Sequence, residues 1–107
     1  MDNSIQQLSL EFKQSLRERY GGRFAKLILF GSYARGDFHE ESDVDFLVVL
    51  NDEKVQGGDE IFFVSDIVSK LTLKYDKLVS YLPVSYLRLQ NAQTIFYRNI
   101  RREGLEV

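Results

Sequence analysis

Residues 27–50, LILFGSYARGDFHEESDVDFLVVL, place a polar stretch between two short apolar runs. Runs of this length and composition are typical of buried strands. The first run ends at Gly31-Ser32, and the second begins beside Asp43 and Asp45. Because side chains alternate along a strand, the two carboxylates project from the same face. The segment therefore predicts a sheet in which a glycine-serine turn lies opposite a pair of carboxylates.

The rest of the chain predicts helices and one further strand around these two strands. Apolar side chains three or four residues apart indicate the buried faces of helices. The expected elements, in chain order, are a helix with Ile5, Leu8, Phe12 and Leu16 on its apolar face, a strand at 24–30, a helical turn at 32–36, a strand at 44–50, a polar loop at 51–59, a helix from Ile61 to about Tyr75, a strand at 76–82 and a helix at 86–103. Ser85 is the expected N-cap of the last helix.

This order predicts a single α/β domain over residues 1–107, of mixed α+β architecture, with a small mixed sheet of three or more strands flanked by helices. The polarity of the strands is not settled by periodicity. The short connection between the first two strands permits antiparallel pairing, whereas residues 51–75 can supply the crossover helix that parallel strands need.

Composition narrows the class of function. Lys and Arg total 14 against 16 Asp and Glu, and this balance argues against broad nucleic-acid binding, so no direct nucleic-acid partner is expected. The chain has no cysteine and only one histidine, His39, so neither a thiolate nucleophile nor a zinc site is expected. No apolar run approaches the roughly 20 residues of a membrane span, and the N-terminal residues do not form a signal peptide. We expect a cytoplasmic protein.

The residue types around the turn favour a site for a nucleoside triphosphate. Asp43 and Asp45 supply carboxylates of the kind that hold Mg²⁺. Gly31 allows close approach of the backbone to a phosphate, and Ser32 offers a hydroxyl and nearby N–H groups. Arg35 is expected to pair with a phosphate or a carboxylate. Each feature alone is more common on an ordinary surface or turn, but their combination favours the site.

On these residues, the segment resembles the nucleotidyltransferase domain of the DNA polymerase β-like superfamily. It is most similar to the minimal nucleotidyltransferases, in which an apolar strand, Gly-Ser, several residues and Asp-x-Asp follow one another. Gly31, Ser32, Asp43 and Asp45 match this pattern directly. The resemblance implies Mg²⁺-dependent transfer of a nucleoside monophosphate from an NTP such as ATP to a hydroxyl group, with release of pyrophosphate.

The same resemblance implies a protein partner. Minimal nucleotidyltransferases are commonly paired with a small helical HEPN protein, which is a toxin ribonuclease. In such pairs the transferase acts as the antitoxin, and transfer of AMP to a toxin tyrosine is established for some members. Transfer to a small molecule or to RNA is the remaining alternative, but such enzymes generally carry additional domains for which this chain has no room.

The family also implies a third carboxylate on a later strand, as metal ligand and general base. Asp76 is the only acidic residue of the expected strand 76–82, so it is the candidate for this role. The alternative is that the carboxylate is absent, with Leu78 or Ser80 in its place. An antitoxin that binds its partner with little or no catalysis would then be expected.

Aromatic residues are too numerous for a core of this size. Phe62, Phe63, Phe96 and Tyr97 cannot all be buried comfortably. Some of them are expected at an interface, with a partner or between copies of the chain in a homo-oligomer, although scattered exposed aromatic side chains are also normal.

Overall fold

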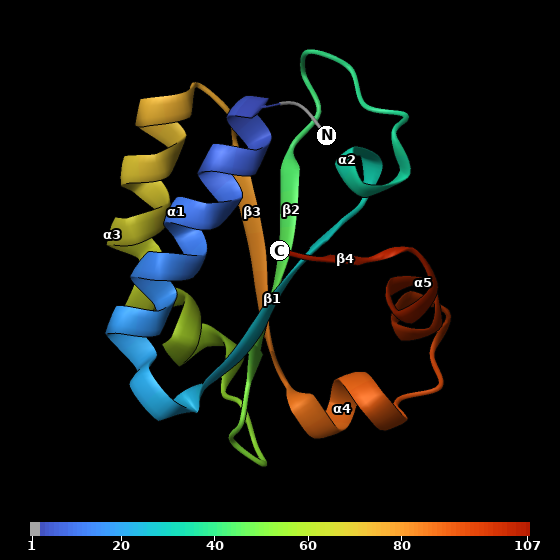
Figure 1. Ribbon diagram of the computed structural model, residues 1–107. Helices are drawn as coiled ribbons and strands as arrows, with labels where there is room; N and C mark the ends of the chain where they lie inside the picture. The colour runs from blue at the N-terminus through green and yellow to red at the C-terminus, as the bar shows by residue number, and fades with distance from the viewer. Residues whose placement is uncertain (1–2) are drawn as a thin grey trace.

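The two strands predicted from the apolar runs lie side by side at the centre of a sheet in the computed structural model, which describes residues 3–107 (Figure 1). The elements are α1 (Asn3–Tyr20), the 3₁₀ helix η1 (Gly21–Arg23), β1 (Phe24–Phe30), α2 (Ser32–Arg35), β2 (Val44–Leu50), α3 (Gly57–Tyr75), β3 (Val79–Ser85), α4 (Tyr86–Asn91), α5 (Ile95–Glu103) and β4 (Leu105–Glu106). The strand order is β3-β2-β1-β4. The predicted α+β architecture with a mixed sheet is confirmed.

Both kinds of strand pairing occur in the sheet. β1 pairs antiparallel with β2, as the short connection between them permits. β2 pairs parallel with β3, and α3 supplies the crossover between them. The two possibilities that the sequence left open therefore apply to different strand pairs.

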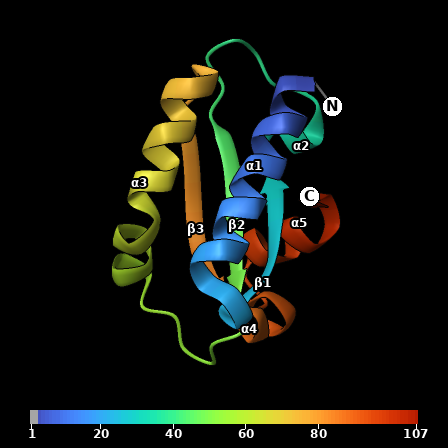
Figure 2. The ribbon, with the colours of Figure 1, turned by 60° about the vertical axis from the view of Figure 1, so that its left-hand side comes forward.

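Helices cover the two faces of the sheet in separate layers. α1 and α3 lie side by side on one face, and α4 and α5 lie on the other (Figures 1 and 2). Alternation along β2 sends Phe46 and Val48 into the core under α1 and α3, and Leu47 and Val49 into the core under α4 and α5. By the same alternation, Asp45 belongs to the face that α5 covers.

The third strand differs from its predicted bounds. The strand predicted at 76–82 stops before Pro83, but β3 runs from Val79 to Ser85. Pro83 lies within the strand and pairs with Val48. A proline is tolerated there because β3 is an edge strand, whose outward N–H groups need no ladder partner.

The last predicted helix is two helices. α4 ends before Ala92, and α5 begins after Thr94, whose hydroxyl accepts a hydrogen bond from the Tyr97 N–H at 3.3 Å. Ser85 is the N-cap of α4, as predicted, and accepts from the Arg88 N–H at 3.1 Å. The second cap lies inside a stretch that the apolar spacing presented as one continuous helix.

Two smaller differences concern the ends of elements. The loop predicted at 51–59 is shorter, because α3 already begins at Gly57. The short strand β4 was not predicted, and it pairs with Ile28 and Leu29 of β1. Its two residues are too few to show a strand pattern in the sequence.

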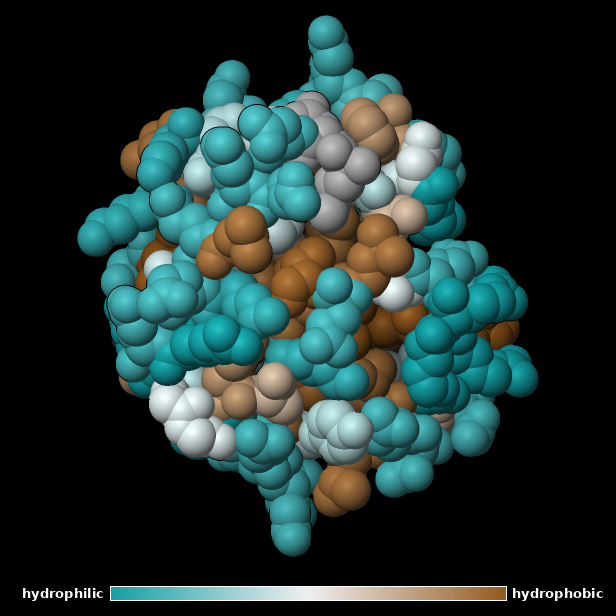
Figure 3. Space-filling model, viewed as in Figure 1, coloured by the Kyte–Doolittle hydropathy of each residue, from teal (hydrophilic) through white to brown (hydrophobic). Residues whose placement is uncertain are grey.

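The surface is mixed in character. Figure 3 shows hydrophilic side chains over most of one face, with hydrophobic ones gathered near its centre. Among the four aromatic residues predicted to exceed the capacity of the core, Phe62 is 83% exposed and Phe63 and Phe96 are each 40% exposed, whereas Tyr97 is buried. Within residues 3–107, no helix is long and apolar enough to cross a membrane.

Candidate active site

Gly31 joins β1 to the short helix α2 and brings the backbone against a carboxylate. Its φ of 74° and ψ of −154° lie in a region that side-chain-bearing residues rarely adopt. Phe30, the residue before it, pairs with Asp45 across the sheet. A β-carbon placed on Gly31 would overlap the Asp45 carboxylate and lie 3.3 Å from its Cγ. The predicted turn and the second aspartate are therefore in direct contact.

The two aspartates of the motif differ in environment. Asp43 precedes β2 and is exposed, whereas Asp45 lies within the strand and is half-buried. Burial raises the pKa of the Asp45 carboxyl, and the nearby charge of Asp43 raises it further. Two neighbouring carboxylates form a negative site that favours a cation.

Ser80 lies beside Asp45 on the neighbouring strand. The two residues are register partners in the parallel pair β2–β3. The Ser80 hydroxyl donates a hydrogen bond to the Asp45 carboxylate, which partly opposes the rise in its pKa. The position on β3 nearest to Asp45 is thus occupied by a hydroxyl and not by a carboxylate.

Asp76 does not join the two aspartates in a three-carboxylate group. It is the exposed C-cap of α3, with a left-handed φ of 51°, and it lies before β3 begins. Among residues 3–107, no group of three or more His, Cys, Asp or Glu side chains is placed to hold a metal ion together. The geometry that the described residues show is therefore a pair, Asp43 and Asp45.

Ser32 and Arg35 lie on the helical turn next to Gly31. Ser32 is the first residue of α2, and the first N–H groups of a helix have no acceptor within that helix. Arg35 is exposed, and its Nε donates to Asp37 Oδ2 at 3.3 Å. The positive charge of Arg35 also lowers the pKa of Asp45, against the effect of burial. A cationic side chain therefore accompanies the two carboxylates.

A cavity of about 410 Å³ opens over this turn. One wall comes from the end of β1, the turn and β2, and the other comes from α5. Its lining residues are Phe30, Gly31, Ser32, Arg35, Asp45, Phe96, Asn99, Ile100 and Glu103. Sequence reasoning missed Asn99 and Glu103, because only the folded packing of α5 against the sheet brings them to the motif.

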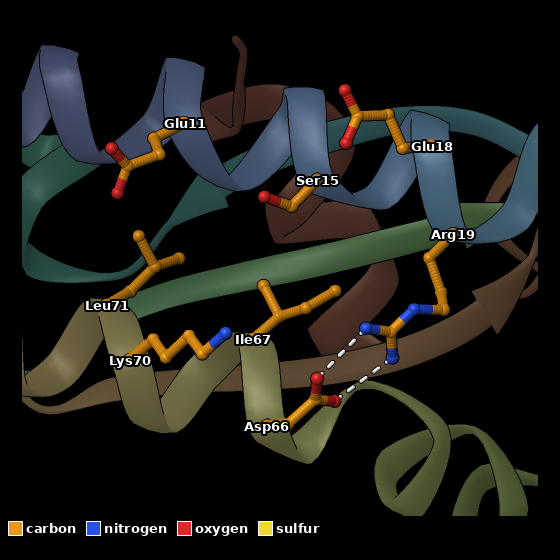
Figure 4. A pocket seen from close by; sticks show the side chains of 8 residues that line it. All are labelled: Glu11, Ser15, Glu18, Arg19, Asp66, Ile67, Lys70 and Leu71. Atoms are coloured by element: carbon orange, nitrogen blue, oxygen red, sulfur yellow. Dashed lines mark hydrogen bonds and ion pairs between the residues drawn. The ribbon is translucent and has the colours of Figure 1, made fainter.

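A second cavity, of about 520 Å³, is a groove between α1 and α3. Figure 4 shows Arg19 and Asp66 pointing toward one another across it, and their closest atoms are 2.9 Å apart. Lys74 pairs with Glu11, which also lines the groove, at 2.6 Å. Opposite charges that neutralise one another in this way are typical of a helix-helix contact, and none of the motif residues reaches this groove.

The carboxylate oxygens at the turn suit a magnesium ion that is also bound to the phosphates of a substrate. Mg²⁺ in proteins is usually held by one or two carboxylates together with water and substrate phosphates. Asp43 and Asp45 supply this number of carboxylates, and the absence of a β-carbon on Gly31 leaves room beside them. The residues present are thus compatible with such an ion.

Comparison with known proteins gives the family. The sequence profile of the nucleotidyltransferase domain matches residues 10–101. A relative from Methanocaldococcus jannaschii, named as a candidate protein adenylyltransferase, is 41% identical over 95 residues, which cover 88% of each chain. The protein adenylyltransferase MntA of Thermococcus cleftensis is 48% identical over 44 residues, which cover 41% of this chain and 42% of MntA.

Solved structures share the fold. A crystal structure of a toxin-antitoxin with AMP-PNP matches with a TM-score of 0.60 and 24% identity, over 97% of this chain and 69% of the other. A complex of tri-AMPylated HEPN toxin from Shewanella oneidensis with its MNT antitoxin matches with a TM-score of 0.60 and 19% identity, over 95% of this chain and 70% of the other. By its sequence profile and its fold, this chain belongs to the nucleotidyltransferase domain family of enzymes, as the residues of its Gly-Ser and Asp-x-Asp motifs predict.

Proposed function

We propose that this protein is a single nucleotidyltransferase domain that transfers AMP from ATP to a hydroxyl group of a HEPN-type toxin, and so acts in the cytoplasm as the antitoxin of a toxin-antitoxin pair. The observation that carries the proposal is the contact between Gly31 and Asp45. It brings a backbone turn suited to phosphate and a carboxylate suited to a cation into one place.

Each residue of the site has a separate task. Gly31 and Ser32 hold the phosphate chain through N–H groups and a hydroxyl, and Arg35 neutralises part of its charge. Asp43 and Asp45 hold Mg²⁺. When bound, this ion offsets the charge of the triphosphate and of the departing pyrophosphate.

The reaction conserves all atoms. The oxygen of the acceptor hydroxyl forms a bond to the α-phosphorus of ATP, and the bond between that phosphorus and the oxygen leading to the β-phosphate breaks. Pyrophosphate and the hydroxyl proton are released. The turn and its neighbours contribute by fixing the phosphate chain so that the leaving pyrophosphate points away from the acceptor.

Two comparisons support the choice of AMP and of the partner. The relatives that match most of this chain are named as candidate protein adenylyltransferases. A protein of the same fold occurs in a complex with a tri-AMPylated HEPN toxin. Both observations concern other proteins, and they make ATP and a HEPN protein the first substrates to test.

The direct test measures the mass of the partner. The protein is incubated with ATP, Mg²⁺ and a HEPN-type toxin that it binds, and the intact mass of the HEPN protein is recorded. We expect a gain of one or more AMP groups, and no gain with an Asp43→Asn, Asp45→Asn double variant. A partner of unchanged mass, under conditions in which ATP binds, would contradict transfer to this partner.

A second function is an antitoxin that inhibits its toxin by binding alone. Ser80 favours it, because a hydroxyl lies beside Asp45 where a third carboxylate is expected in the family. A site with two carboxylates retains the means to bind ATP with a metal ion, but it lacks a general base at that position. Inhibition would then come from covering the toxin.

The growth of cells that express the toxin separates the two functions. If chemistry is required, the Asp43→Asn, Asp45→Asn double variant should fail to protect them although it still binds the toxin. If the double variant protects as well as the parent protein, binding alone is sufficient and the second function is correct.

A further inference from the structure

The cavity over the Gly-Ser turn has two chemically different ends. The end formed by β1, the turn and β2 carries Ser32, Arg35 and Asp45, which suit phosphate and a cation. The end formed by α5 carries an aromatic ring, an amide and a carboxylate, from Phe96, Asn99 and Glu103. A volume of about 410 Å³ lies within the range of small-molecule sites.

Phe96 provides a fixed apolar wall. Its ring packs edge-on against Phe30, with ring centroids 5.7 Å apart, and edge-on against Tyr97, with centroids 5.2 Å apart. These contacts hold the ring in place from two sides, yet the residue is still 40% exposed. An oriented ring that lines a cavity is a suitable surface for the face of a nucleobase.

One exposed arginine contacts both Glu103 and Asn99. Nη2 of Arg102 donates to Asn99 Oδ1 at 3.0 Å and to Glu103 Oε1 at 3.2 Å. An ionised carboxylate has two oxygens and about four lone-pair sites, so Glu103 retains capacity to accept further hydrogen bonds. These remaining lone pairs suit uncharged O–H and N–H donors.

We propose that α5 forms the nucleoside end of the site, where Phe96 packs against the base and Glu103 accepts hydrogen bonds from uncharged donors of the nucleoside. This inference rests on the proposed nucleotide-binding function and adds an orientation to it. The triphosphate lies at the turn, and the base and sugar lie against α5. The donors are the ribose hydroxyls or an exocyclic amino group of the base.

The first test separates the nucleoside from the phosphates. Affinities for ATP and for inorganic tripolyphosphate, both with Mg²⁺, are measured for the parent protein and for Phe96→Ala. We expect the variant to bind ATP about tenfold more weakly and tripolyphosphate unchanged, since stacking is lost and the phosphate contacts remain. Equal losses for both ligands, or no loss for ATP, would overturn the role of Phe96.

Two further variants show whether a loss of ATP affinity in Phe96→Ala comes from a folding defect. Ile95→Ala changes a neighbouring residue of α5 that is 70% exposed and does not line the cavity, so its ATP affinity should match the parent. Phe96→Leu keeps most of the packing against Phe30 but removes the aromatic face. It should also lose ATP affinity while its melting temperature stays closer to that of the parent.

The second test addresses Glu103 with three nucleotides. The parent protein should prefer ATP over 2′-deoxyATP if Glu103 binds the ribose, or ATP over ITP if it binds the amino group of the base. Glu103→Gln should reduce that preference, whereas Glu106→Gln, an exposed carboxylate outside the cavity, should preserve it. Identical preferences in the parent and Glu103→Gln would overturn the role of Glu103.

The outcomes also distinguish this inference from the proposed function. A parent protein that binds neither ATP nor tripolyphosphate would contradict both. A parent protein that binds both ligands with equal affinity, with no change in Phe96→Ala, would overturn only the assignment of α5 and leave the phosphate end intact.

Discussion

Gly31 and Asp45 are packed so closely that no side chain larger than a hydrogen atom fits between them. The Gly31 backbone adopts a φ of 74°, and a β-carbon on it would overlap the Asp45 carboxylate. The register of the sheet creates this contact, because Phe30 and Asp45 are cross-strand partners. Glycine is therefore required at this turn both for its backbone conformation and for the space that it leaves.

Gly31→Ala is expected to abolish nucleotide binding. The added methyl group displaces the Asp45 carboxylate, and the unusual backbone conformation costs a further 1–3 kcal/mol, roughly, in the free energy of unfolding. Gly36→Ala is the matched control, because Gly36 has a φ of 89° but open space around its missing β-carbon. Titration with ATP and urea unfolding measure both effects. Loss of ATP binding in both variants would show that backbone strain, and not the Asp45 contact, is responsible.

Ser80→Asp is expected to increase turnover. A carboxylate on β3 beside Asp45 would add a metal ligand and a proton acceptor, and acid-base groups of this kind contribute about 10²-fold or more to rates. The rate of AMP transfer to the HEPN protein measures the effect. Without divalent cations the variant should be less stable than the parent, because three carboxylates repel one another.

Ser80→Asn is the neutral control for this change. Its amide is close in size to the aspartate carboxyl but brings no charge, so neither the rate nor the dependence on Mg²⁺ should rise. An equal rate for the parent and for Ser80→Asp would show that the missing carboxylate does not limit the reaction.

Asp45→Asn is expected to stabilise the protein in the absence of divalent cations. Burial, and then the charge of Asp43, raise the pKa of Asp45 in the folded state. The folded state therefore binds this proton more tightly than the unfolded state, whose aspartate pKa is about 3.9. Below that pH Asp45 is protonated, and its charge does not destabilise the folded state. As the pH rises through the higher folded pKa, the carboxylate ionises and the free energy of unfolding declines. The advantage of the variant should grow above a pH of about 4 and be complete at neutral pH.

Urea unfolding over this pH range measures the advantage of Asp45→Asn. Glu40→Gln, which removes an exposed loop carboxylate, should show no such trend. A lower stability of Asp45→Asn at neutral pH would contradict the account, because it would mean that the charge of Asp45 stabilises the fold.

Asp66→Asn should change stability in the opposite direction, and only slightly. Arg19 donates hydrogen bonds to Asp66 and lowers its pKa to about 2. The stabilisation from this exposed pair is fully present above the unfolded pKa of about 3.9 and is lost as pH falls through the folded pKa. The variant should not show this loss of stability at acid pH. If the free energy of unfolding falls in parallel for the parent and Asp66→Asn as the pH is lowered, the pair contributes nothing.

The two strands that carry the motifs could be predicted because the sequence of each shows both its apolar run and the residues that end it. The predicted strands 24–30 and 44–50 coincide with β1 and β2. Each is a mainly apolar run bounded by polar or glycine residues. The run indicates burial on both faces of the sheet, and the residues that bound it indicate where the strand begins and ends. The contact between the turn and the carboxylates follows once the two strands pair.

The third strand and the far wall of the cavity were not predictable in the same way. Pro83 has no backbone N–H, so in the sequence it indicates the end of a strand. It is accepted inside β3 only because β3 lies at the edge of the sheet. That shift places Ser80 beside Asp45 and leaves Asp76 on the end of α3. Glu103 reaches the cavity only through tertiary packing, for which the sequence contains no local signal.

We propose that Asp43 and Asp45, beside the Gly31 turn, form the nucleotide site, which both proposed functions need. Calorimetric titration with ATP and Mg²⁺ tests it most directly. The Asp43→Asn, Asp45→Asn double variant should bind at least about tenfold more weakly than the parent. A Glu40→Gln, Glu41→Gln double variant, with the same change of charge in the exposed loop, should bind as the parent does. Undiminished binding by the Asp43→Asn, Asp45→Asn variant would contradict the assignment of the site.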